Sequence, residues 1–483
     1  MTVDYDVVVI GGTQAARQAA IAAAHLQSRV ALVEPHAPGK TWLGTGLLYS
    51  KVMAQSARDN ESIDICLEED FISKPLPPEA KFASNLEWAK EVVSTLEEQT
   101  SPSVLASLGV DVLVEDGEFC RRPHLAFIVK NRYLRARTYL IATGSRPALP
   151  TIEGLLGVGY LTPAEVWQQS PSQQMPAHWV VIGSGAVGTE IAQTLARLGV
   201  DVTLVTKKSQ ILPQEDPEVA GLVQAQLEAE GVRVITQAEV RQVQRIDGKK
   251  WVLAGNRAIE ADEIVLAAGQ QPNVETLNLE GVGVEWNRRG IVVNKKLQTS
   301  NPRIYACGSV IGGYELTHMA DYEAKIALKN ALFLPLFQVD YRGIPWGIFS
   351  DPTLARVGLT EVQAMQRYGK DVWVSRQYFK TLSKALLGGE TTGLCKIIAR
   401  SNGKILGASI VGAQANELIH TIALAMRHNL NVNAIAQLPM LSPSFSEIIQ
   451  QTAHEWNSQC LNRNRTLQNF LEEWFNWRRS WSS

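Results

Sequence analysis

Two short glycine-rich turns have the residue types and spacing to bind the diphosphate of a dinucleotide. The first follows the apolar run 7–10 and contains Gly11, Gly12, Thr13, Ala15 and Ala16. A strand, a glycine turn, a helix, a second strand and an acid, here Glu34, form the dinucleotide fingerprint. In this fingerprint the helix N-terminus faces the diphosphate and the carboxylate binds ribose hydroxyls. The match is degenerate, because Thr13 replaces the second fingerprint glycine and Ala16 the third.

The second turn matches the fingerprint completely. It lies between the predicted strand 178–182 and a helix from about residue 189 to 198, and it contains Gly183, Gly185, Ala186, Val187 and Gly188. Two such units in one chain predict two nucleotides that meet, which is the arrangement needed for hydride transfer between them.

The residues after the next predicted strand, 201–205, bear on the choice of nicotinamide. An NAD site has an acid there for the ribose hydroxyls, whereas this chain has Lys207 and Lys208. Without a carboxylate to repel it, a 2′-phosphate would meet one or two ammonium groups. We therefore predict NADPH in preference to NADH; the alternative is that both lysines are solvated turn residues.

Three further segments support a specific family resemblance. They contain Ala142, Thr143 and Gly144, then Gly269 in 267–273, then Gly308 and Ser309 in 304–309. Together with both turns and with 357–361, 404–408 and 412–419, they resemble the pyridine nucleotide-disulfide oxidoreductase family over roughly residues 3–456. The resemblance implies an α/β fold with two Rossmann-like domains, for FAD and NAD(P), and a C-terminal α+β dimerisation domain. The implied boundaries are 1–150 with 275–340 for FAD, 151–274 for NAD(P) and 341–456 for the dimerisation domain of a homodimer.

The chain departs from this family at the residues that perform its usual reaction. The stretch 39–51 keeps Thr41 and Lys51, which match the family, but Trp42 and Leu47 occupy the positions of its two redox thiols. Ser442 stands where the family has a catalytic histidine, while the supporting carboxylate, Glu447, is kept. Ser309 also replaces an aspartate that would hydrogen-bond the flavin's ribityl chain; serine can still donate or accept but brings no charge.

Lys51 and Glu190 occupy the positions of the lysine–glutamate pair with which the family supports flavin N5. The resemblance therefore implies that they are catalytic and lie beside FAD, where a paired ammonium favours the reduced flavin. The alternative is that both are ordinary solvated helix residues.

These features predict an FAD-dependent NAD(P)H oxidoreductase without a redox disulfide. Thiol–disulfide exchange requires an attacking thiolate, which this site lacks. An apolar, aromatic-walled slot suits a flat acceptor such as a quinone, or dioxygen; otherwise Trp42 and Leu47 simply fill the space. A soluble NAD(P) transhydrogenase is an alternative, and so is a non-catalytic nucleotide sensor or scaffold, which Thr13 and Ser309 favour.

Composition excludes several other classes. The 483 residues carry 46 basic and 48 acidic side chains, so no nucleic-acid partner is expected. The five cysteines are scattered and never in Cys-x-x-Cys spacing, so neither a disulfide framework nor a metal site is expected. The chain enters a strand at once, and we expect a cytoplasmic protein.

The segment 457–483 lies beyond the resemblance and is rich in tryptophan. Its apolar residues recur at three- and four-residue spacing and predict an amphipathic helix: Leu467, Phe470, Leu471, Trp474, Phe475, Trp477 and Trp481. We expect this tail to pack on its own dimer or a partner protein, or to lie on a membrane surface.

Overall fold

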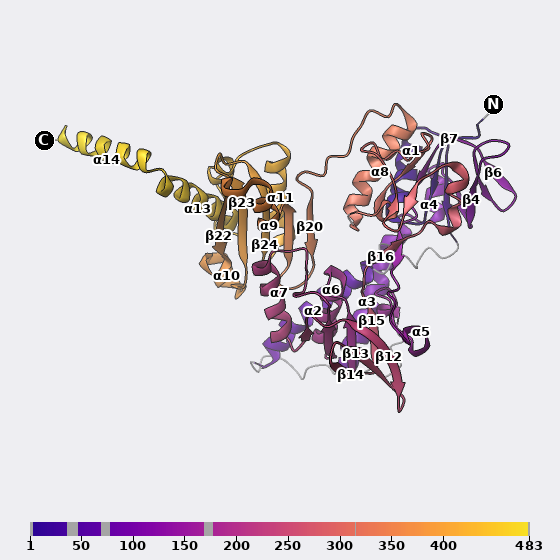
Figure 1. The fold of residues 1–483 in the computed structure, drawn as a ribbon, viewed down its shortest axis with the longest axis horizontal. Helices are drawn as coiled ribbons and strands as arrows, with labels where there is room; N and C mark the ends of the chain where they lie inside the picture. Colours follow the sequence, from indigo (N-terminus) through magenta and orange to yellow (C-terminus); the bar gives the residue numbers. More distant parts are fainter. Residues whose placement is uncertain (1–2, 36–46, 69–77, 169–176, 314, 482–483) are drawn as a thin grey trace. The chain divides into compact units, whose positions relative to one another are not determined.

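The computed structural model describes residues 3–35, 47–68, 78–168, 177–313 and 315–481 (Figure 1). The chain forms two compact units. The first comprises Met1–Lys207 and Gln237–Asp340, and the second comprises Lys208–Thr236 and Tyr341–Ser483. The domain boundaries predicted above differ from this division and remain a prediction.

The first unit is built on a parallel sheet in the order β19-β7-β1-β2-β3. Its strands are β1 (Tyr5–Ile10), β2 (Val30–Glu34), β3 (Asp111–Val114), β7 (Ala136–Ile141) and β19 (Ile304–Ala306). Helices α1 (Gln14–His25) and α8 (Thr317–Leu332) pack together on one face, against Val7 and Val9. On the other face, Val8 and Ile10 pack in a cluster with Phe119. Burial of both faces explains why β1 is a continuous run of β-branched residues.

A second parallel sheet of the same unit contains β10, β9 and β15 as neighbours. Their bounds are Asp201–Val205, His178–Ile182 and Glu263–Leu266, and those of the helix after β9, α6, are Ala186–Arg197. The expected strands 178–182 and 201–205 are therefore confirmed, and the helix begins three residues earlier than expected.

The first unit also contains smaller sheets and further helices. The remaining strands are β4 (Gly117–Cys120), β5 (Ala126–Val129), β6 (Arg132–Leu134), β8 (Ser145–Pro147), β12 (Val240–Ile246), β13 (Lys249–Ala254), β14 (Arg257–Ala261), β16 (Gln270–Pro272), β17 (Trp286–Asn287) and β18 (Gly290–Ile291). The remaining α-helices are α2 (Leu47–Glu68), α3 (Pro78–Glu98), α4 (Pro102–Ser107) and α5 (Leu155–Val158).

The second unit contains an antiparallel sheet in the order β20-β21-β24-β23-β22. These strands are Pro345–Ile348, Leu354–Gly358, Ile405–Val411, Leu394–Arg400 and Val372–Tyr378. The other elements are α7 (Pro217–Ala229), β11 (Arg233–Ile235), α9 (Glu361–Tyr368), α10 (Ser383–Gly388), α11 (Ala415–Arg427), α12 (Val432–Ala436), α13 (Glu447–Arg463) and α14 (Arg465–Ser480).

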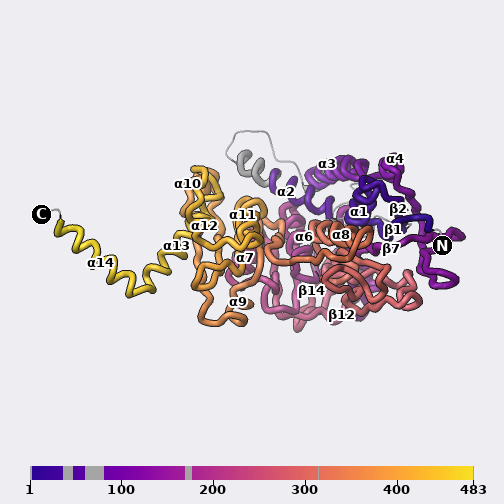
Figure 2. Tube along the Cα trace, turned by 90° about the horizontal axis from the view of Figure 1, so that it is seen from above, coloured from indigo at the N-terminus to yellow at the C-terminus, as the bar shows by residue number. Residues whose placement is uncertain are grey.

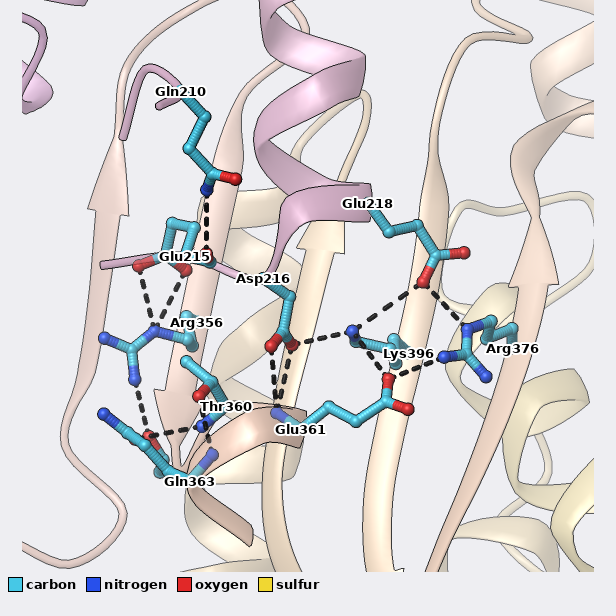
Figure 3. A network of polar contacts seen from close by, with 11 residues as sticks. Gln210, Glu215, Asp216, Glu218, Arg356, Thr360, Glu361, Gln363, Arg376 and Lys396 are labelled. Carbon is cyan, nitrogen blue, oxygen red and sulfur yellow. Dashed lines mark hydrogen bonds and ion pairs between the residues drawn. The ribbon is translucent and has the colours of Figure 1, made fainter. Parts of the chain in front are cut away.

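A network of charged side chains fixes the start of α7 to this sheet (Figure 3). The Lys396 side chain is only 1% exposed, and its Nζ lies 2.6 Å from Asp216 Oδ2 and 3.2 Å from Glu361 Oε2. Beside it, Arg356 Nε lies 3.0 Å from Glu215 Oε2, and burial raises the pKa of Glu215 to about 7. Removing one partner of a buried pair leaves the other charge uncompensated, which typically costs about 3–5 kcal/mol.

The predicted amphipathic helix is confirmed as α14, but it does not continue α13. Figure 2 shows the bend between the two helices. Asn464, with φ −94° and ψ 79°, separates them and caps α14 by accepting a hydrogen bond from the Leu467 N–H at 3.0 Å. Within the part of the chain that the structure describes, no helix is long and apolar enough to cross a membrane.

Candidate functional site

The first glycine turn approaches the end of β7 so closely that Gly11 has no room for a side chain. Gly11 has φ +136°, and a Cβ placed on it would lie 2.2 Å from the Ala142 carbonyl oxygen. The parallel register that sets Ile10 opposite Ile141 produces this contact, because it brings the ends of β1 and β7 to the same edge of the sheet. Glycine is the residue that this turn can accept.

Thr13 ties the turn together through its hydroxyl group. It is the N-cap of α1, and its Oγ1 accepts a hydrogen bond from the Ala16 N–H at 3.2 Å and donates one to the Ala142 carbonyl at 2.8 Å. The first N–H groups of a helix have no partner within the helix and are available to an anion. The Thr13 hydroxyl therefore takes one of the N–H groups that a fingerprint glycine would leave for phosphate.

A hollow lies at the carboxyl ends of the strands, where three predicted segments meet. Its lining includes Thr13, Gln14, Ala15, Ala142, Gly144, Cys307, Gly308, Ser309, Thr317 and Ala320. The hydroxyls of Ser309 and Thr317 are buried and have no hydrogen-bond partner among the described residues. A buried polar atom without a partner is costly, so a bound group that supplies hydrogen bonds fits this hollow. The start of α1 and these two hydroxyls match the diphosphate and polyol of FAD.

Glu34 ends β2 and is almost fully buried, but it already has a partner within the protein. Arg17 Nε lies 2.7 Å from Glu34 Oε1, and Arg17 Nη2 lies 3.3 Å from Oε2, which makes the pair bidentate. The Glu34 side chain is 2% exposed. A ribose that binds this carboxylate must therefore share it with a guanidinium group.

The second glycine turn has the same close contacts and a more open helix end. Gly183 has φ +113°, and its Cβ would lie 2.2 Å from the Ala267 carbonyl oxygen, while a Cβ on Gly188 would lie 1.9 Å from the Gly183 carbonyl oxygen. Gly185, the N-cap of α6, has no side-chain cap, and a Cβ on it would meet nothing within 4 Å. Gly185 therefore places no side chain in the way of a diphosphate at the first turn of α6, where Ala186 and Val187 lie.

Lys207 and Lys208 follow β10 and are both exposed, whereas Thr206 before them is buried. They come one and two residues after Thr206, which stands where the first nucleotide unit has the buried Glu34, because Val205 pairs with Ile182 as Val33 pairs with Ile10. Two exposed lysines at the end of this strand give it a local positive charge, which attracts a phosphate group.

The segments 142–144 and 269–273 are hydrogen-bonded to each other. Thr143 Oγ1 donates to the Asn273 carbonyl at 2.7 Å, and the Asn273 N–H donates to the Gly144 carbonyl at 3.0 Å. Gly269 lies just before these contacts with φ +112°, and a Cβ on it would meet nothing within 4 Å. These two predicted cofactor-binding segments thus run side by side where the chain passes between the two parallel sheets of the first unit.

The structure brings Lys51 and Glu190 together from helices α2 and α6. Lys51 Nζ lies 2.6 Å from Glu190 Oε2, with the side chains 26% and 5% exposed. Burial lowers the pKa of Lys51, and the charge of Glu190 partly restores it. Positions separated by 139 residues in the sequence are therefore paired at the first turn of α2 and the start of α6.

The residues predicted to replace the family's two thiols and its histidine are only partly described. Thr41 and Trp42 lie outside the described residues, and Leu47 is half-buried as the first residue of α2. Ser442 is exposed, and the Glu447 carboxylate accepts a hydrogen bond from the Ser444 N–H at 2.9 Å. Among the described cysteines, Cys307 and Cys395 are buried. Burial raises the pKa of the Cys395 thiol to about 12 and that of Cys307 well above its usual range, so both are poor nucleophiles.

Comparison with known proteins identifies the class. The family model of the pyridine nucleotide-disulphide oxidoreductases matches residues 5–324, and the model of their dimerisation domain matches residues 344–453. The chain therefore belongs to this family, whose members use FAD and NAD(P)H, and the second match indicates a homodimer.

Particular relatives cover most of the chain. A mercuric reductase of Staphylococcus aureus is 32% identical over 437 residues, which are 89% of this chain and 78% of that enzyme. A dihydrolipoyl dehydrogenase of Bacillus subtilis (strain 168) is 32% identical over 470 residues, 93% of this chain and 96% of that enzyme. Among solved structures, the Cu(II) complex of the HOCl-induced flavoprotein disulfide reductase RclA of Escherichia coli aligns with a TM-score of 0.82 and 25% identity, covering 94% of this chain and 99% of that one. The predicted fold class is confirmed.

The sequence did not reveal Arg17 or Thr317 as site residues. Arg17 lies one helical turn after Thr13 in an otherwise alanine-rich helix, and this isolated charge beside the fingerprint was the available signal. Thr317 is the first residue of α8 and carries no motif signal, because only the fold brings α8 to the hollow.

Proposed function

We propose that this protein is an FAD-dependent NAD(P)H oxidoreductase whose electron acceptor is not a disulfide. Bound FAD would supply two-electron transfer between a nicotinamide and an acceptor. The chain's own residues would hold it: the start of α1, Gly11, Ser309 and Thr317 around the diphosphate and polyol, and Glu34 at a ribose. NADPH is the proposed donor, because Thr206, Lys207 and Lys208 follow β10, where an NAD site has an acid.

The start of α2 carries this proposal. Leu47, the first residue of the helix, stands at the position of a redox thiol, and one turn later Lys51 keeps its ion pair with Glu190. The ammonium group that favours a reduced flavin is thus kept, while the adjacent position offers no sulfur. Since thiol–disulfide exchange requires a thiolate, the usual reaction of the family has no attacking group at Leu47.

A quinone is the acceptor class that we propose. Leu47 and Trp42 would make the acceptor side apolar and aromatic, and such a surface binds a flat, uncharged ring. At the family's acid–base position, Ser442 has no imidazole to transfer a proton. An acceptor that takes electrons without acid–base assistance from the protein is consistent with this loss.

Steady-state turnover with two kinds of acceptor tests the proposal. With NADPH as donor, the protein should reduce a benzoquinone and should fail to reduce lipoamide or oxidised glutathione. Replacing the half-buried thiols, by Cys120→Ser and Cys460→Ser, should leave quinone turnover unchanged. Lipoamide reduction at the quinone rate, abolished by a thiol-blocking reagent, would contradict the proposal.

A second candidate is a non-catalytic protein that senses nucleotides. The hydrogen bonds of Thr13 and the Arg17–Glu34 pair favour it, because both occupy groups that would otherwise bind FAD. The absorption spectrum of the purified protein separates the two candidates. Flavin bands that bleach with NADPH support the enzyme, whereas a colourless protein that still binds NADPH supports the sensor.

A further inference from the structure

Helix α14 exposes an unusual amount of apolar surface. None of its residues, all of which the structure describes, is buried. The side chains of Phe470 and Phe475 are 58% and 48% exposed, and that of Trp481, which caps the helix, is 71% exposed. Large apolar side chains gathered on one exposed element mark a surface that another structure covers.

The apolar residues of α14 occupy one broad side of the helix. At about 100° per residue, the side chains from Leu467 to Trp481 span about 160° of the circumference. The other side carries only polar residues: Arg465, Thr466, Gln468, Asn469, Glu472, Glu473, Asn476, Arg479 and Ser480. Ring centroids of Trp477 and Trp481 lie 4.1 Å apart, and those of Trp474 and Trp477 lie 5.2 Å apart, so the indoles form a continuous row.

Helix α14 follows α13, which is packed against the sheet of the second unit. Trp456 of α13 is buried and packs against Trp373, and the Arg463 guanidinium lies 4.7 Å from the centre of the Trp373 ring. Asn464 then ends α13 and caps α14. Helix α14 therefore extends as a separate helix from the packed helix α13, as Figure 1 shows at the C-terminus.

We propose that α14 binds the interface of an anionic lipid bilayer, with its apolar side among the acyl chains and its axis parallel to the surface. The charges of residues 457–483 support an anionic lipid surface as the binding partner. Four arginines, at positions 463, 465, 478 and 479, outnumber the two glutamates, which both lie on the polar side. Tryptophan and arginine are the residues that such interfacial helices use, because an indole has an apolar body and a polar N–H and arginine reaches the headgroups.

The same features disfavour a second copy of the helix as the occupant. A two-helix seam needs a narrow stripe of apolar residues, whereas this side is broad. Arg478 also lies on the apolar side, about three turns along from Leu467. In a helix pair its charge would be buried, but at a membrane surface its side chain can extend to a phosphate.

Flotation of the full-length protein with lipid vesicles tests this proposal. The probes are vesicles of phosphatidylcholine alone and of phosphatidylcholine with phosphatidylglycerol, at low and high salt. The protein should float with the anionic vesicles, and less so at high salt. The double variants Trp474→Ser/Trp477→Ser and Arg478→Glu/Arg479→Glu should each reduce flotation about tenfold or more.

Matched controls place the effect on α14. Trp88→Ser/Trp286→Ser removes two exposed indoles of the first unit, and Arg257→Glu/Arg288→Glu reverses two exposed charges there; both should float like the unaltered protein. No flotation with either vesicle would overturn the proposal. So would a tail variant that changes the oligomeric state in light scattering without changing flotation, since a second copy would then cover the helix. The assay needs neither NADPH nor an acceptor, so its outcome is independent of the proposed reaction.

Discussion

The two glycine turns of the first unit connect a parallel strand to a helix in the same way, yet they leave different helix ends. Gly11 and Gly183 both have positive φ. A Cβ built on either glycine would lie 2.2 Å from the carbonyl oxygen of the residue that follows a neighbouring strand. At the next fingerprint position, however, Thr13 caps α1 with its own hydroxyl, whereas Gly185 leaves α6 uncapped. Both turns thus bring two backbone segments close together. They differ in that a side chain caps the N–H groups of α1 but not those of α6.

The residues that follow the turns differ in the same direction. The first site has Ala16 where the second has Gly188. Glu34, paired with Arg17, stands where the second site has Thr206, which two exposed lysines follow. The first turn therefore satisfies part of its own helix end with a side chain, whereas Gly185 has no side chain that could do this at the second turn.

Replacing Gly188 by alanine should produce the largest effect. Its Cβ would lie 1.9 Å from the Gly183 carbonyl oxygen, a backbone atom that cannot move away cheaply. We expect the free energy of unfolding to fall by up to about 3 kcal/mol in urea denaturation. Gly221→Ala, in α7, is the matched control, because its Cβ meets nothing within 4 Å and alanine favours helix. Unchanged stability of G188A would contradict this difference, because the second turn would then accommodate alanine as the first turn accommodates Ala16.

Reversing the charge after β10 should come next in size. The double variant Lys207→Glu/Lys208→Glu should shift the ratio of kcat/KM for NADPH to that for NADH about tenfold or more toward NADH, equivalent to about 1.4 kcal/mol. Lys384→Gln, which removes an exposed lysine of the second unit, should leave the ratio unchanged. A native protein that already prefers NADH would refute the assignment of these lysines.

Removing the Thr13 hydroxyl should have the smallest effect on stability and an opposite effect on binding. Thr13→Gly loses one cap and one hydrogen bond to Ala142, which costs about 1 kcal/mol. It also frees the Ala16 N–H for phosphate, so the dissociation constant for FAD, measured by fluorescence, should decrease. Thr13→Ser keeps the hydroxyl and should bind FAD as the native protein does. Weaker FAD binding by T13G would mean that the Thr13 contacts support the site.

Much of the fold could be predicted from local pattern. Buried runs rich in β-branched residues located β9 and β10 to the residue, because both faces of a parallel strand are apolar. Gly183 ends the first run, and the polar residues from Thr206 onward end the second. The amphipathic spacing of 467–481 likewise predicted α14. The sequence did not predict the break between α13 and α14 at Asn464. An asparagine can cap a helix, but only the backbone conformation shows whether it does so.

The ion pairs that were missed depend on tertiary structure. Lys396 meets Asp216 across 180 positions, and no periodicity reports a buried ion pair of that kind. Arg17 and Glu34 are closer, but their pairing depends on the register of β1 with β2. Lys51 and Glu190 could be placed together only through the family resemblance, which supplied the tertiary relation that residue types lack.

An anaerobic reductive titration tests the central claim most directly. A flavin and a disulfide each accept two electrons. A member of the family with both therefore accepts four electrons, or two equivalents of a two-electron donor, for each FAD. If Trp42 and Leu47 replace the thiols, the purified holoprotein should be fully reduced by one equivalent of NADPH or dithionite for each FAD. Uptake of two equivalents, with new thiols detected after reduction, would contradict the account.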